Sequence, residues 1–118
     1  MYPDRRILLI FQPHRFTRMQ ALFDRFATVL SSVPQAVLLP VYAADEKPIP
    51  GVTSDLISAE VEKQGGHCLP VSNKVDAVEA TLSLVRPDDL VLTEGAGDVC
   101  VVGDMLVQEL NKRPTSAL

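Results

Sequence analysis

The chain alternates short apolar runs of strand length with segments whose apolar residues recur at helical spacing, and this alternation repeats four times. The four expected strands cover residues 7–11, 36–42, 67–71 and 90–95. The first run, ILLIF, is apolar throughout, which is typical of a strand covered on both faces. Strands and helices in this order predict an α/β fold: a Rossmann-like, mostly parallel sheet with flanking helices in a three-layer αβα arrangement.

The expected helices carry their own start and stop patterns. The first is predicted over 17–30 with its threonine as N-cap, and the second over 53–64, ended by the glycine pair at 65–66. A third begins after Asn73, whose side chain is the expected N-cap. The last, over 98–112, is apolar on more than one face. We expect it to be largely buried or to face another domain.

The composition is that of one globular domain. The length of 118 residues and the apolar fraction of 47% allow a substantial core and disfavour disorder. The net charge of −4, with 5% aromatic residues and no tryptophan, disfavours binding to nucleic acid or to an anionic membrane. The longest apolar stretch, 36–44, contains a proline and is too short to span a bilayer.

The first residues also lack a signal-peptide core, so a cytoplasmic location is expected. Cys68 and Cys100 are expected to be buried thiols in a reducing compartment, with a disulfide between them as the alternative. Neither has the neighbouring ligands that a zinc site requires, and no other metal site is predicted.

The first strand-to-helix corner, FQPHRFTR at 11–18, concentrates positive charge. Parallel α/β folds bind ligands at such corners. Arg15 and Arg18 are three residues apart, so they are expected to project to the same side of the first helical turn. Cations are electrostatically misplaced at a helix N-terminus, and a bound carboxylate or phosphate would remove the conflict, with His14 as a further donor. Alternatively, both arginines pair with surface carboxylates, and the residues alone leave both interpretations open.

Two other corners carry polar residues. After the second strand, Tyr42, Asp45 and Glu46 either contact an amine or a metal-bound water, or lie in a solvated turn. The turn TEGAGD at 93–98 contains glycines that allow a ligand to approach the backbone closely. It matches neither a P-loop nor a dinucleotide fingerprint, and Asp98 would repel a phosphate.

Together the three corners resemble the C-terminal domain of the Mur ligases. The motifs that carry the resemblance are FQPHRFTR at 11–18, VYAADEKPIPG at 41–51 and LTEGAGD at 92–98. Their order and spacing agree with the family, most closely with its members that attach L-alanine to UDP-N-acetylmuramate in peptidoglycan synthesis. The resemblance implies an ATP-dependent ligase that forms an acyl phosphate. ATP and Mg²⁺ would be bound mainly by domains absent from this chain.

The resemblance also implies roles for individual residues. Arg15 and Arg18 would hold the carboxylate of the alanine, with His14 nearby. Tyr42 and Glu46 would line the cleft between domains as further substrate-binding residues. The implied cofactor-binding positions are those of the last corner: Gly95, Ala96, Gly97 and Asp98.

The sequence departs from the family pattern in two places. It has Asp45 where the family commonly has glycine, and an aspartate tolerates left-handed backbone well enough to keep this turn. The helix that follows Asp98 lacks the usual lysine. Beyond these departures, the P-loop, the central ATPase domain, the N-terminal UDP-binding domain and the first strand–helix unit of this domain are all absent from the chain.

We therefore interpret residues 1–118 as a fragment of a three-domain ligase. On its own it is expected to be inactive. Because a missing strand–helix unit bares apolar surface, the chain is also expected either to self-associate or to be only marginally stable. The alternative from a different class is a non-catalytic Rossmann-like module that binds a small anion or nucleotide for a partner. A structural or dimerising domain is the third interpretation.

Overall fold

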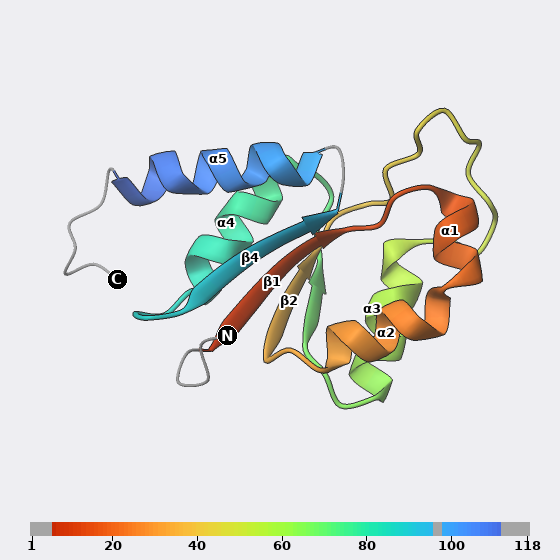
Figure 1. Cartoon of the computed structure of the whole chain (residues 1–118), viewed down its shortest axis with the longest axis horizontal. Helices are drawn as coiled ribbons and strands as arrows, with labels where there is room; N and C mark the ends of the chain where they lie inside the picture. Colours follow the sequence, from red (N-terminus) through yellow and green to blue (C-terminus); the bar gives the residue numbers. More distant parts are fainter. Residues whose placement is uncertain (1–5, 96–97, 112–118) are drawn as a thin grey trace.

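The computed structural model describes residues 6–95 and 98–111. Within these ranges, four parallel strands form one sheet in the order β3-β2-β1-β4 (Figure 1). The strands are β1 (Ile7–Gln12), β2 (Gln35–Leu38), β3 (Cys68–Pro70) and β4 (Leu90–Gly95). The α/β fold that the sequence predicts is confirmed.

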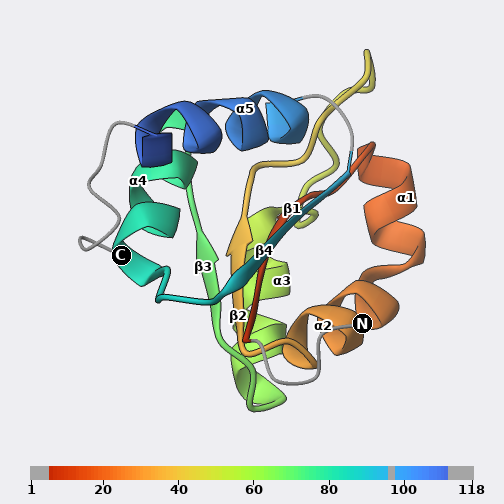
Figure 2. The same ribbon diagram turned by 60° about the vertical axis from the view of Figure 1, so that its left-hand side comes forward.

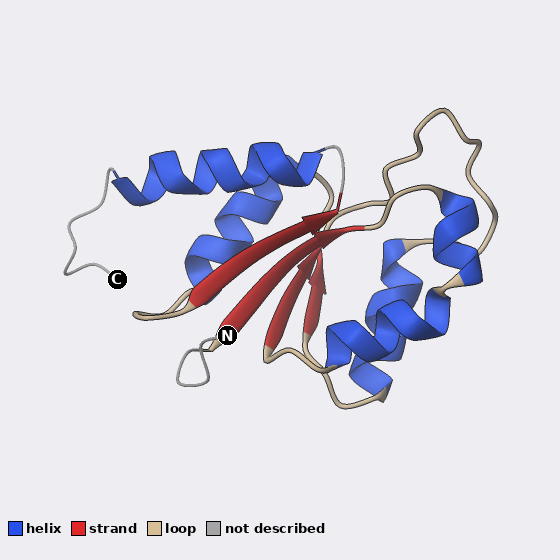
Figure 3. Ribbon diagram, viewed as in Figure 1, coloured by secondary structure: helices blue, strands red, loops and turns tan. Residues whose placement is uncertain are grey.

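Helices cover both faces of the sheet and give the molecule three layers (Figures 2 and 3). The helices on one face are α1 (Phe16–Ala21), α2 (Phe23–Ser31) and α3 (Ser54–Lys63). Those on the opposite face are α4 (Lys74–Leu84) and α5 (Asp98–Asn111).

Strand β1 separates two hydrophobic cores. Leu8 and Ile10 are buried on the side of α4 and α5, whereas Leu9 is buried on the side of α1, α2 and α3. Successive side chains of a strand point to opposite faces, so a strand between two helical layers needs an apolar residue at every position. This is why the first run of the sequence shows no polar alternation.

The order of the strands creates a switch point at the carboxyl ends of β1 and β4. From β1 the chain steps outward through β2 to β3, and then returns to place β4 on the other side of β1. The helix after β1 covers one face, and the helix after β4 covers the other (Figure 1). In open parallel sheets, such divergence leaves the crevice in which ligands bind.

The predicted helix boundaries after β2 and β3 are confirmed. The Thr53 hydroxyl accepts a hydrogen bond from the backbone N–H of Leu56 at 3.3 Å, which caps α3. The side chain of Asn73 accepts from the N–H of Asp76 at 2.8 Å, which caps α4. Beyond the end of α3, Gly65 takes a φ of +90°, a conformation that side chains disfavour.

The prediction of one helix over 17–30 is wrong, because two helices meet at Leu22. Leu22 leaves helical geometry with φ −115° and ψ 19°, and Met19 before it and Ala27 after it are both fully buried. The apolar spacing continues across this bend, so it gave no sign of the break. The N-cap prediction is also wrong, since α1 is preceded by Arg15 rather than by Thr17.

Two expectations about burial need correction. Helix α5 buries Val102 and Leu106 against α4, but Val101 and Val107 are exposed, so the helix is not largely buried. Both cysteines are free thiols; Cys68 is buried as expected, whereas the other, on α5, is exposed.

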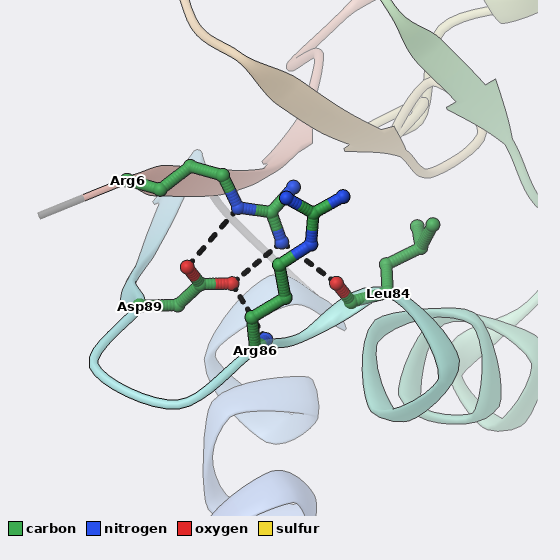
Figure 4. Close-up of polar contacts among 4 residues, drawn as sticks. All are labelled: Arg6, Leu84, Arg86 and Asp89. Atoms are coloured by element: carbon green, nitrogen blue, oxygen red, sulfur yellow. Dashed lines mark hydrogen bonds and ion pairs between the residues drawn. The ribbon is translucent and has the colours of Figure 1, made fainter.

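At the amino end of the sheet, an ion pair joins β1 to the turn before β4 (Figure 4). The Arg6 guanidinium donates to both carboxylate oxygens of Asp89, at 3.1 and 2.6 Å, and to the carbonyl of Leu84 at 2.7 Å. Asp89 also accepts from the backbone N–H of Arg86. The cluster fixes the end of α4 beside the sheet, far from the switch point.

In the part of the chain that the structure describes, no helix is both long and apolar enough to cross a membrane.

Candidate functional site

A hollow of about 400 Å³ opens at the carboxyl ends of β1 and β4. Its polar side chains are Gln12 at the end of β1, His14 from the turn after β1, Arg18 from α1 and Glu94 from the end of β4, beside Gly95. Apolar side chains of β1 and α2 form its wall: Leu9, Phe11, Phe26, Val29 and Leu30. The hollow therefore occupies the crevice that the strand order predicts.

A larger hollow, of about 520 Å³, lies between α2 and α3. Gln20, Glu60 and Lys63 are its polar side chains, and it lies away from the carboxyl ends of the strands. We place the candidate site at the switch point, where His14 and Arg18 meet residues from the end of β4. Another hollow, of about 390 Å³, also joins several strand-to-helix corners, but its charged lining residue is the acidic Asp55.

The structure brings Arg18, but not Arg15, into the hollow. Arg15 precedes α1 with a φ of +70°, and its backbone N–H donates to the carbonyl of Tyr42 at 2.7 Å. A non-glycine residue at positive φ is held there by its surroundings, and this hydrogen bond supplies part of the restraint. Since α1 is only six residues long, a helix dipole contributes little to an anion site.

Tyr42 lies beside His14, with their ring centroids 5.8 Å apart. The backbones of these residues form an isolated parallel bridge, and the N–H of Tyr42 donates to the Pro13 carbonyl at 2.8 Å. The bridge prolongs the pairing of β1 with the chain after β2. In this way the second corner is held against the first. The strand predicted over 36–42 is shorter in the structure, because β2 ends at Leu38.

Glu46 is joined to α1 rather than to a ligand. Its carboxylate accepts from the Thr17 hydroxyl and the Thr17 backbone N–H, and these hydrogen bonds, together with the charge of Arg15, lower the pKa of Glu46. Arg15 lowers this pKa through its charge but forms no ion pair with Glu46 among the described contacts. The expectation for Asp45 is confirmed, because it takes a left-handed φ of +70° in the turn that presents Glu46.

Gln12 is a structural residue of the site to which the sequence reasoning gave no role. It is buried, its side-chain amide donates to the carbonyl of Pro40 at 3.2 Å, and its side-chain oxygen accepts from the N–H of Val99 at 3.2 Å. It therefore ties the end of β1 to the loop after β2 and to the start of α5. The only sign in the sequence was a polar residue ending an apolar strand.

The predicted cofactor turn is described only in part. Gly95 pairs with Gln12 and takes a φ of +122°, and a side-chain carbon at this position would overlap the carbonyl oxygen of Gln12. The predicted Ala96 and Gly97, and the side chain of Asp98, lie outside the described residues. Gly95 is thus required by the close approach of β1 and β4, independently of any ligand.

The described residues present no ready cluster of ligands for a metal ion. Among them, no three or more His, Cys, Asp and Glu side chains are grouped so that they could hold a metal ion. The carboxylate of Glu94 also lies at the hollow, where it opposes a phosphate.

Comparison with known proteins agrees with the motifs. The family model described as "Mur ligase, glutamate ligase domain" matches residues 1–97. UDP-N-acetylmuramate–L-alanine ligases from Syntrophobacter fumaroxidans and Streptomyces avermitilis are 42% and 41% identical to this chain, over 92% and 93% of its length. One from Geotalea daltonii is 37% identical over 94%. In each case the match covers 24% of the relative's own length. Because this family model matches well over half of the chain, the chain belongs to the Mur ligase family.

Proposed function

We propose that this chain is the amino-acid-binding C-terminal domain of an ATP-dependent ligase that joins L-alanine to UDP-N-acetylmuramate. The names of the relatives support these substrates, and the 24% coverage supports a division of the reaction among several domains. The observation that carries the proposal is the convergence of Arg18 and His14 in the hollow at the switch point.

In this proposal Arg18 binds the carboxylate of the alanine. A guanidinium can donate two parallel hydrogen bonds to a carboxylate, which fixes both the position and the orientation of the ligand. His14, held by its bridge to Tyr42, is a second donor at the same hollow. The side chains of Arg15, Tyr42 and Glu46 lie outside the hollow, and we assign them to the surface that faces the rest of the ligase.

The activation of the muramate carboxylate as an acyl phosphate belongs, in the same proposal, to domains outside this chain. ATP and Mg²⁺ would supply that chemistry there; among the described residues, no three or more His, Cys, Asp and Glu side chains are grouped so that they could hold a metal ion. The turn at 95–98 would approach the nucleotide from the side of this domain. The chain alone is accordingly proposed to lack ligase and ATPase activity.

An exposed apolar surface supports a partner domain. Among the described strands β4 is an edge, and it leaves Leu92 42% exposed. On α2, beside the hollow, Val29 is 57% exposed. Apolar side chains along an unpaired strand favour association, either with the rest of the ligase or with a second copy of the isolated chain.

Titration of the ¹⁵N-labelled chain with L-alanine, followed by NMR, tests the proposed function. Shift changes are expected to centre on the backbone around His14, Arg18 and Gly95, and Arg18→Ala should abolish them. The matched control is Arg25→Ala, which removes an exposed arginine of α2 that does not line the hollow. Saturable shifts that survive Arg18→Ala, or shifts centred elsewhere, would contradict the proposal.

Nucleotide titration of the same sample distinguishes the competing module. Tight independent binding of ATP without any response to L-alanine would favour a nucleotide-binding module over a ligase domain.

A further inference from the structure

Glu94 brings a negative charge into a hollow where Arg18 and His14 are hydrogen-bond donors. It shares the lining with Arg18 and His14, yet among the described residues Arg6 and Asp89 form the only ion pair. Within the same part of the chain, the Glu94 carboxylate has no hydrogen-bond donor. Two opposite charges therefore face one hollow without neutralising each other.

The register of the sheet explains why Glu94 faces this side. In the parallel pairing of β1 with β4, Leu9 is opposite Leu92 and Phe11 is opposite Glu94. Paired residues of neighbouring strands point to the same face, and Leu9 and Phe11 pack on the side of α1, α2 and α3. Glu94 thus points into the same layer from which α1 presents Arg18.

We propose that Glu94 binds the ammonium group of the amino acid, so that the hollow recognises its ligand as a zwitterion. This inference rests on the proposed function and assigns the second charged end of the ligand. Arg18 would bind the carboxylate and Glu94 the ammonium, both carried by the same carbon of an α-amino acid. The ligand would then bridge two charges that the protein itself leaves apart.

The rest of the hollow restricts the class of amino acid. Its wall is formed by apolar side chains, among them Phe11 and Phe26, so an apolar side chain on the ligand is favoured. A second carboxylate on the ligand would meet Glu94 and be repelled. The site therefore takes neutral amino acids with apolar side chains and rejects acidic ones.

The test compares L-alanine with propionate, which has the carboxylate but no ammonium group. Wild-type chain should bind L-alanine more tightly than propionate. Glu94→Gln should weaken the binding of L-alanine about tenfold, which is the loss expected for one exposed charge-assisted hydrogen bond. The affinity for propionate should be unchanged or higher. Glu79→Gln is the matched control, because it removes the same charge from an exposed site on α4, on the opposite face of the sheet.

The outcomes separate this inference from the proposed function. If Glu94→Gln binds L-alanine like wild type while Arg18→Ala does not bind it, the role of Glu94 is overturned and the amino-acid site stands. If wild type shows no response to L-alanine, or Arg18→Ala leaves its affinity unchanged, the proposed function fails and the role of Glu94 fails with it. The backbone NMR spectrum of each variant verifies that it is folded.

Discussion

The carboxylate of Glu46 accepts two hydrogen bonds from Thr17, one from the hydroxyl at 2.6 Å and one from the backbone N–H at 3.1 Å. The loop after β2 is thereby fastened to the first turn of α1. Two corners of the sheet that are distant in sequence are held as one unit beside the hollow.

This contact predicts the titration of Glu46. Its pKa is lowered chiefly by the hydrogen bonds from Thr17, so the contribution to stability is present above the ordinary glutamate pKa and is lost as the pH falls through the lowered value. Thr17→Val removes the hydroxyl and should raise the pKa of Glu46 toward its ordinary value. NMR titration of the side-chain carboxyl measures it, and an unchanged pKa in the variant would contradict the assignment.

The ion pair between Arg6 and Asp89 predicts a loss of stability when either partner is changed. The side chain of Asp89 is only 3% exposed, so Arg6→Gln leaves a nearly buried carboxylate without its guanidinium and should cost about 2 kcal/mol. Asp89→Asn should cost less, because the remaining Arg6 guanidinium is more exposed than Asp89 and keeps its hydrogen bond to the Leu84 carbonyl. Urea unfolding at neutral pH measures both, and Arg25→Gln on α2 is the exposed control.

The same pair predicts how stability depends on pH. The hydrogen bond from Arg6 is the largest cause that lowers the pKa of Asp89. Its stabilisation is therefore complete above the unfolded aspartate pKa of about 3.9 and is lost as the pH falls through the lower folded value. Asp89→Asn should remove this part of the acid sensitivity. Equal slopes of unfolding free energy against pH in wild type and variant would show that the pair contributes nothing.

Substitution of two glycines by alanine should change the stability of the fold in opposite directions. A side-chain carbon at Gly66 would lie 2.7 Å from the Cα of Ser31 and 2.8 Å from Val61 Cγ1, so Gly66→Ala should destabilise the fold by about 1–3 kcal/mol. At Gly103, within α5, the nearest atom would be Thr93 Cγ2 at 3.5 Å, an ordinary contact. Gly103→Ala should therefore stabilise the helix by about 0.5–1 kcal/mol. Thermal unfolding of the two variants checks the opposite signs.

The two thiols should differ in reactivity. Burial raises the pKa of Cys68 to about 11, whereas Cys100 is exposed. Because the thiolate is the reactive form, a disulfide reagent at about pH 8 should modify one thiol per native chain quickly and the other only after unfolding. Cys100→Ser should abolish the fast phase, and Cys68→Ser should keep it. A fast phase that persists in Cys100→Ser would contradict the burial of Cys68.

Local chemistry predicted the helix caps and the strands of this fold. Thr53 and Asn73 cap the helices that follow them because their hydrogen bonds depend on residues three positions away, which the sequence displays directly. The break at Leu22 could not be foreseen in this way. It depends on how the two helices lie across the sheet, and the apolar spacing continues through it.

The sequence predicted a ligand site at the first strand-to-helix corner, and the structure has a hollow there that contains some of the expected residues. The arrangement of parallel strands located the crevice, and Arg18 and His14 lie there. Arg15 was grouped with Arg18 by their spacing on an assumed helix, whereas a bridge between His14 and Tyr42 sets the backbone at this point. Pairings between distant segments decide such positions, and neither Gln12 nor Glu94 is distinguishable without them.

The pairing of β1 with β4 has a consequence for the order of folding. His14 and Arg18 are synthesised before β2, whereas Glu94 and Gly95 follow only after β2, β3 and three helices have been added. Closing so long a loop is slow and gives no favourable contact until both strands meet. The hollow is therefore among the last features to form on the ribosome, and a nascent chain stalled before Leu90 would hold half of a site with nothing to complete it.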